Sequence, residues 1–276
     1  MPWHARLDLD YAVEGGRSVA RYAHDGPLRI LQSLYPEGGG VCHNVLVHPP
    51  GGLVGGDTLA LDVVAREGSH GLVTTPGAAR FYRSEGAQAL QHARISVAGG
   101  GRLEWVPLEA LYYSGCLAEN WLEMDIAPGG ELIGWDVAAF GLPQANQPFL
   151  RGHVQQHLQL RGAWLERGCI DAHDTRLMDG PLGLAGHRCL ATLFFACGSD
   201  IARARRDAAL EAARAVIDAH PLASTAGVTS PNPRVLVVRA LAPLVEPAMG
   251  LLRAVRRAWR PLLWSLPPSE PRGWAI

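Results

Sequence analysis

The sequence predicts a mainly β protein, made of stacked layers of short strands with two α-helices in the C-terminal third. Apolar and polar residues alternate from Ala5 to Tyr11 and again from Thr58 to Val63, which is the period of a strand with one buried face. Glycine-containing turns separate such runs along most of the chain before residue 200. A helical period appears only in two later segments.

Three of the turns share a frame, in which an aliphatic residue and an alanine precede the turn and an apolar run follows it. The three alanines, Ala65, Ala98 and Ala127, are separated by 33 and 29 residues. A strand–turn–strand unit that recurs at such an interval favours stacked β layers over a parallel α/β sheet. Ordinary hairpins with common turn residues explain the same spacing, so both interpretations stay open at this point.

The two helical segments come late in the chain. Residues 201–220 are rich in alanine and arginine, follow possible caps at Ser199 and Asp200, and stop before Pro221. From Leu244 onward an apolar stripe recurs at steps of four and three residues, formed by Ala248, Leu252, Val255, Trp259 and Leu262. We expect the stripe to pack onto a sheet, with docking of a partner as the alternative. The neighbouring arginines are expected on the exposed side: Arg253, Arg256, Arg257 and Arg260.

The proline-rich tail carries Trp274, and we expect it either to pin the C-terminus or to contact a partner. No linker divides the chain, so a single domain is expected over residues 1–276.

Composition excludes several classes of function. The net charge is −1, so nucleic acid and membrane surfaces are poor candidates as partners. All 25 basic residues are arginine. Without lysine the chain has no P-loop lysine, Schiff-base lysine or lysine general base. The five cysteines are scattered without a CxxC pair, and no run of 18 apolar residues occurs; both features indicate reduced thiols and a cytoplasmic protein.

The densest motif is residues 42–57, CHNVLVHPPGGLVGGD. Its GGxxGG spacing and the strand-like run after it do not fit a dinucleotide-binding loop, which opens a helix. A tight backbone crossing that aims Asp57 into an interior fits better. Cys42, His43 and His48 are ligand types suited to nickel or zinc, although a lone histidine is more often structural.

Two further features have open interpretations. Arg80 and Arg83 follow a Pro-Gly turn at residues 76–77 and could clamp a carboxylate or phosphate, or pair with acidic neighbours. Carboxylates also recur at strand positions, and a pair at the right separation would suit a glycosidase: Asp57, Glu104, Glu109, Asp136 and Glu166. No nucleophile elbow, HExxH helix or cysteine–histidine signature is present.

Taken together, these segments resemble the UreD (UreH) family of urease accessory proteins. Residues 42–57 resemble its CHxxLLHPPGGxVGGD hallmark, and residues 74–84, TTPGAARFYRS, its TTPGAxKFYRS signature. Residues 103–109, 134–136 and 271–274 are similar to its LEWLPQE, GWD and PRIW motifs, in the same order over nearly the whole chain. Gln147 stands where the family has a glutamate, which removes one charge.

The resemblance implies a β-helix-like fold and a non-enzymatic role as a nickel metallochaperone scaffold. Such a protein binds UreF, recruits the GTPase UreG through UreF, and docks on apo-urease. Nickel then passes through an interior tunnel to the urease site, so no tightly bound cofactor is expected, only transient Ni²⁺.

By the same resemblance, the tunnel candidates are Asp57, Asp136 and Glu166, with His48 as a tentative fourth group. Weak, spaced carboxylates suit transit of Ni²⁺, whereas a cage of histidine and cysteine would trap the ion. Structural ion pairs remain the alternative for each carboxylate. The alternative functions are a β-solenoid carbohydrate-active enzyme that uses paired carboxylates, and a small-molecule-binding β-barrel.

Overall fold

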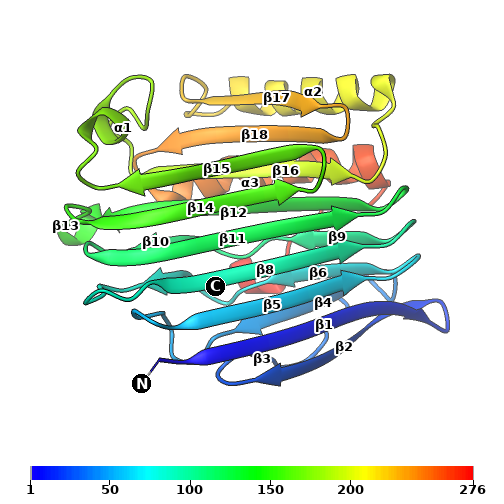
Figure 1. The fold of residues 1–276 in the computed structure, drawn as a ribbon. Helices are drawn as coiled ribbons and strands as arrows, with labels where there is room; N and C mark the ends of the chain where they lie inside the picture. The colour runs from blue at the N-terminus through cyan, green and yellow to red at the C-terminus, as the bar shows by residue number, and fades with distance from the viewer. Residues whose placement is uncertain (1, 276) are drawn as a thin grey trace.

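Residues 2–275 are described by a computed structural model, in which two β-sheets lie face to face (Figure 1). The first sheet has seven strands, and its five central strands run parallel. In spatial order its strands are β15 (Trp164–Asp171), β14 (Gly152–Leu160), β11 (Cys116–Ile126), β8 (Ala89–Val97), β5 (Thr58–Ala65), β1 (His4–Glu14) and β2 (Arg17–Asp25).

The second sheet combines four parallel strands with an antiparallel extension. In spatial order its strands are β17 (Ala226–Asn232), β18 (Val235–Ala242), β16 (Cys189–Cys197), β12 (Glu131–Leu142), β9 (Arg102–Trp105), β6 (His70–Thr74), β4 (Cys42–Val47) and β3 (Arg29–Ile30). Three short strands lie beside this path: β7 (Ala79–Phe81), β10 (Ala110–Tyr112) and β13 (Gln147–Pro148).

The chain crosses from the first sheet to the second in a repeated coil, which confirms the predicted stacked layers. The pairs β5–β6, β8–β9 and β11–β12 each cross through one of the glycine turns. Successive turns are joined by backbone hydrogen bonds, such as the one from Gly100 N to Gly129 O at 3.0 Å. The spacing of the three alanines is not the strand register at the first step, because Ala65 pairs with Val97 rather than with Ala98. Ala65 and Val97 are both buried and share the inward face, which sets this register.

Two apolar cores hold the layers together. Inward residues of both sheets pack into an inter-sheet core, whereas the outward residues of the second sheet pack against helices. In β12, for example, Leu132 and Ala138 belong to the inter-sheet core, and Trp135 and Val137 belong to the outer core. The side chain of every second residue of β12 therefore points between the sheets.

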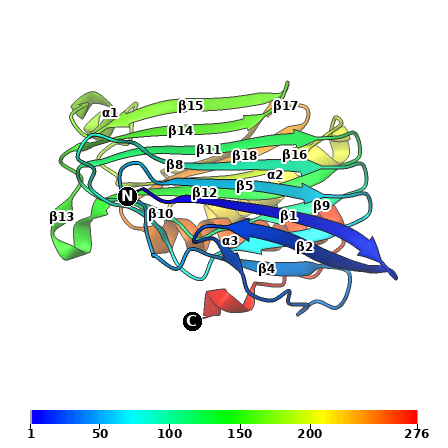
Figure 2. The same cartoon turned by 60° about the horizontal axis from the view of Figure 1, so that its bottom comes forward.

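The outer core lies under α2 (Arg203–Asp218) and α3 (Val245–Trp264), which cover the face of the second sheet that points away from the first (Figure 1, Figure 2). The predicted apolar stripe of α3 packs there, except that Leu262 is exposed. The predicted caps of the earlier helix are wrong: α2 starts after Ala202, which has no capping side chain. A five-residue helix that we did not predict, α1 (Thr175–Asp179), is capped by Asp174. No helix among residues 2–275 has the length and apolar character needed to cross a membrane.

Gly134 gives a direct test of the inter-sheet packing. A Cβ added to this residue of β12 would lie 2.5 Å from the ring of Phe194 on the neighbouring strand. We expect Gly134→Ala to lower the free energy of unfolding by about 1–3 kcal/mol, because the packed core has no room for the methyl group. Urea denaturation measures the change. Gly168→Ala on β15 is the matched control, since a Cβ there meets nothing within 4 Å; equal losses in both variants would contradict the packing argument.

Candidate functional site

A row of polar side chains crosses the inter-sheet core at the level of Asp136. Asp136 points inward from β12 and accepts hydrogen bonds from two carboxamides of the first sheet, Asn120 Nδ2 at 2.8 Å and Gln156 Nε2. Gln91 Nε2 in turn donates to Asn120 Oδ1 at 3.2 Å. Gln91, Asn120 and Gln156 occupy paired positions on β8, β11 and β14, so one inward position of three successive strands is polar.

The row continues toward the end of the solenoid that carries β15 and β18. Thr192 pairs with Asp136 in the second sheet, and Arg239 pairs with Thr192 on the next strand. Arg239 reaches across to Glu166 of β15 in an ion pair, and Trp164 Nε1 donates to the same carboxylate at 3.0 Å. We call the whole row the polar belt; its members are Gln91, Asn120, Gln156, Asp136, Thr192, Arg239 and Glu166.

Asp136 has an unusual protonation equilibrium within the belt. Burial raises the pKa of its carboxyl group to about 6, although the hydrogen bonds from Asn120 and Gln156 act in the opposite direction. Its hydrogen-bond donors are neutral amides, and neutral donors offset only part of the cost of burying a charge. The carboxyl group of Asp136 therefore changes charge near pH 6, well above the range in which an exposed carboxylate in an ion pair is protonated.

A pocket of about 240 Å³ meets the other end of the belt at Gln91. Its walls come from the loops at residues 48–53 and 75–80, which are the two densest sequence motifs. His48 lines the pocket, and its Nε2 atom is buried with no hydrogen-bond partner among the described residues. Burial lowers the pKa of His48, against the opposing charge of Asp57. Arg80 lines the same pocket and forms no ion pair within residues 2–275.

Asp57 occupies a different position from the other two predicted carboxylates. Its Oδ1 accepts the backbone N–H of Trp3 at 2.7 Å, and its Oδ2 accepts that of Val54 at 2.9 Å. Asp57 is buried and closes the glycine turn just before β5, the strand that we predicted at this point. The structure thus brings Asp136 and Glu166 into one inter-sheet space and holds Asp57 in a backbone-capping role.

The two histidines of the first motif are also separated. His43 bonds to Glu37 at 2.8 Å, away from the pocket that His48 lines. The sequence interpretation missed the three carboxamides of the belt. The signal that could have found them is a polar residue at the inward position of neighbouring strands, where the alternating pattern expects an apolar one.

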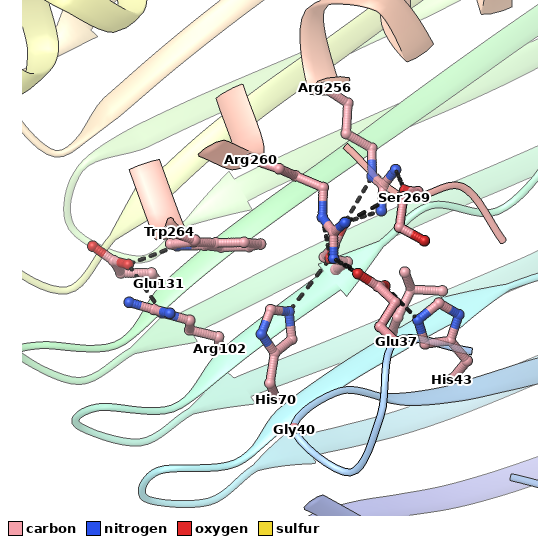
Figure 3. A network of polar contacts seen from close by, with 12 residues as sticks. Glu37, Gly40, His43, His70, Arg102, Glu131, Arg256, Arg260, Trp264 and Ser269 are labelled. Carbon is pink, nitrogen blue, oxygen red and sulfur yellow. Dashed lines mark hydrogen bonds and ion pairs between the residues drawn. The ribbon is translucent and has the colours of Figure 1, made fainter. Parts of the chain in front are cut away.

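A buried ion-pair network lies on the outer face of the second sheet (Figure 3). Glu104 of β9 accepts from Arg256 Nε at 2.7 Å and from Arg260 Nε at 3.2 Å. Arg260 also binds Glu37, at 2.8 Å. The expectation that these two arginines are exposed is wrong: both are fully buried, because α3 turns them toward carboxylates of the sheet and of the loop before β4.

The same arginines hold the C-terminal tail. Arg256 Nη1 donates to the backbone carbonyl of Ser269 at 2.7 Å. Trp274 stacks on Trp135 with ring centroids 5.1 Å apart, and its Nε1 donates to Thr74 Oγ1 at 2.9 Å. The tail is therefore pinned to the outer face of the second sheet, which is the first of the two expected arrangements.

Comparison with known proteins shows similarity over the full length. A family model described as "UreD urease accessory protein" matches residues 4–275. A protein of Paracidovorax citrulli named "Urease accessory protein UreD" is 65% identical over 276 residues, with 100% of both chains covered. A protein of the same name from Variovorax paradoxus is 65% identical over 275 residues with the same coverage. One from Leptothrix cholodnii is 53% identical over 276 residues, with 99% of both chains covered.

Proposed function

This chain belongs to the UreD family of urease accessory proteins, and we propose that it passes nickel to a urease during the maturation of that enzyme. The observation that carries the proposal is the polar belt, which lines the inter-sheet space with the carboxylates of Asp136 and Glu166. We further propose that the chain is a scaffold without catalytic activity of its own.

The ligand chemistry of the belt supports transit of an ion rather than storage. Ni²⁺ accepts oxygen ligands, but it binds imidazole and thiolate more tightly. Apart from the guanidinium of Arg239, which is paired with Glu166, the belt consists of two carboxylates, three neutral amides and a hydroxyl group. Such groups can replace part of the hydration shell at each step without enclosing the ion, and an ion that is held weakly at several sites can move on.

The pocket beside His48 supplies one opening of the proposed route, because Gln91 belongs to both the pocket and the belt. His48 offers a neutral imidazole there, since burial lowers its pKa. We assign Asp57 to holding the turn rather than to the route, because both of its carboxylate oxygens already accept backbone N–H groups.

The proposed partners are apo-urease, UreF and, through UreF, the GTPase UreG. The complete absence of lysine supports this division of work. A nucleotide hydrolase of the P-loop class needs a lysine on the phosphates, so that activity has to come from another polypeptide. Transient Ni²⁺ is the cargo in this proposal and not a resident cofactor.

The proposal is tested by deleting the gene in a urease-positive host and complementing it with the wild-type chain. We expect the deletion strain to contain urease protein of low activity and low nickel content, and complementation to restore both. Urease activity and metal content of the purified enzyme are the measurements. A deletion strain with fully active, nickel-loaded urease would show that the chain has another function.

Glu166→Gln tests the far end of the belt. We expect the initial rate of urease activation to fall about two- to fivefold, because the lost charge is already offset by Arg239 in an ion pair of modest strength. The measurement is activation of apo-urease in complemented cell extracts at limiting nickel. Glu123→Gln, which breaks a contact with His92 on the outer face of the first sheet, is the control; a similar drop in that variant would count against a role in transit.

A further inference from the structure

The helix layer leaves a hollow at one end of the outer face of the second sheet. Leu111 of β10, Ala139 of β12 and Cys189 of β16 lie side by side there, in paired positions of neighbouring strands. They line a pocket of about 290 Å³, together with the 3₁₀ helix Pro143–Ala145 and the residues that begin α3. The pocket is separate from the polar belt, because its lining faces away from the inter-sheet core.

Two carboxylates without partners border this pocket. Glu109 precedes β10 and shares the outer face with Leu111, two residues later. Glu246 lies in the first turn of α3. Within residues 2–275 neither side chain forms an ion pair or accepts a hydrogen bond, whereas Arg188, which also lines the pocket, is bound to Asp179 at 2.8 Å. The pocket therefore carries negative charge that no described residue offsets.

The electrostatics of the pocket favour a cation over an anion. Burial is the largest cause of the raised pKa of the Cys189 thiol, about 12, and the charges of Glu109 and Glu246 act in the same direction. Their field thus reaches the floor of the pocket. The N-terminus of α3 has no capping side chain, and Glu246 in its first turn offsets the partial positive charge of the helix end.

The surrounding surface favours a short inserted segment over the flat face of a second copy. None of the large apolar side chains that are strongly exposed within residues 2–275 lines this pocket. The apolar surface is therefore confined to the hollow. A stable interface between two copies would bury about 1,200 Å² or more around an apolar centre, which the hollow by itself does not supply.

We propose that this pocket is a docking site for a short segment of a partner polypeptide that carries an arginine or lysine close to an apolar side chain. The apolar side chain enters the hollow above Ala139, where its removal from water stabilises the complex. The basic group lies at the rim, beside Glu109 and Glu246. Arginine suits this position better than lysine, because its planar guanidinium can bind a carboxylate through two hydrogen bonds. The inference does not rest on the proposed function.

Selection from a phage-displayed library of random heptapeptides on the purified full chain tests the proposal. We expect the enriched peptides to combine a basic residue with a large apolar one. The affinity of one such arginine peptide, labelled with fluorescein, is then measured by fluorescence anisotropy. Glu109→Gln combined with Glu246→Gln should weaken binding about tenfold, because the peptide loses charge-assisted hydrogen bonds. Both carboxylates lack partners in the fold, so this double variant is expected to fold as the wild type does.

A change in the peptide shows whether the two charges act on each other. Citrulline has nearly the shape of arginine but no charge. Replacing the arginine of the peptide by citrulline should weaken binding to the wild-type chain about tenfold and leave binding to the double variant unchanged. Equal losses with both chains would mean that the arginine binds elsewhere, which would overturn the proposal.

The matched control is Glu67→Gln, which removes the same charge from an exposed turn where β12 begins, whereas the pocket lies where β12 ends. The affinity should be unchanged in that variant. Enrichment of peptides without a basic residue, or equal affinity in the double variant and wild type, would contradict the proposal. A wild-type dimer that the double variant fails to form would show that a second copy covers the pocket instead. None of these measurements involves urease or nickel, so their outcome is independent of the test of nickel delivery.

Discussion

Glu104→Ala is expected to lower the free energy of unfolding by about 3–5 kcal/mol, the cost of leaving a buried charge without its partner. Glu104, Arg256 and Arg260 are all fully buried. After the substitution Arg260 keeps Glu37, but Arg256 keeps no anionic partner among the described residues, only the carbonyl of Ser269 and the ring of Trp274. Urea denaturation of the purified chain measures the loss.

The control for this prediction is an ion pair on the outer face of the first sheet. Asp62 binds Arg94 at 2.6 Å, with side-chain exposures of 26% and 52%. Because solvent screens such a pair, Asp62→Asn should cost less than about 1 kcal/mol. If Glu104→Ala lowers the free energy of unfolding by no more than Asp62→Asn does, the buried network contributes little to folding. Limited proteolysis adds an independent measurement, since the tail bound by Arg256 should become cleavable only in Glu104→Ala.

The pH dependence of stability follows from the same network. Burial alone would raise the pKa of Glu104, but the neighbouring side chains of Arg256, His70 and Arg260 hold it well below its ordinary value of 4.5. A carboxyl group with a lowered folded-state pKa stabilises the fold above its unfolded-state pKa, and this contribution is lost as the pH falls. The stability difference between wild type and Glu104→Ala should therefore shrink below about pH 4.

The coils of the fold could be predicted from sequence because their causes are local. Alternation assigns the inward face of each strand, and the glycine turns mark where the chain crosses between sheets. The burial of Arg256 and Arg260 could not be predicted in this way. Arginines one helical turn apart indicate a solvated face unless their partner is known, and Glu104 lies more than 150 residues earlier.

In the candidate site, too, the sequence predicts which residue types are present but not which contacts they make. A glycine motif precedes Asp57, and Gly134 and Trp135 precede Asp136, so sequence alone treats both carboxylates as equivalent. The two carboxylates differ in their contacts with distant segments. The backbone N–H of Trp3 donates to one oxygen of Asp57, whereas the side chains of Asn120 and Gln156 donate to Asp136 across the core. Three-dimensional placement, and not residue type, makes Asp136 the better candidate for transit.

Asp136→Asn is expected to slow nickel-dependent activation of apo-urease by about 10- to 100-fold, the equivalent of an interaction with a charged group worth about 1.5–3 kcal/mol. The substitution removes the negative charge at the centre of the belt, while the asparagine side chain has nearly the same shape as that of aspartate. The hydrogen bonds can be completed, because the amide of Gln156 can turn its oxygen toward the new amide group. The measurement is the initial activation rate at limiting nickel, in extracts that contain the partner proteins.

Stability distinguishes loss of transit from loss of structure in this variant. The pKa of Asp136 is raised from 3.8 to about 6, so ionisation costs the folded state free energy as the pH rises through this range. Asp136→Asn removes that cost, and we expect the variant to be more stable than wild type above pH 6 by about 1–3 kcal/mol. Near pH 4 the two proteins should be equally stable, since Asp136 is then protonated in the wild-type fold.

The two measurements together decide the role of the belt. Slow activation by a chain that is at least as stable as wild type at neutral pH can arise only from the missing charge. Asp62→Asn makes the same chemical change on the outer face and should leave the activation rate unaffected. Normal activation by Asp136→Asn would mean that nickel does not pass this carboxylate, and destabilisation at pH 7 would mean that Asp136 holds the sheets together as a charged group.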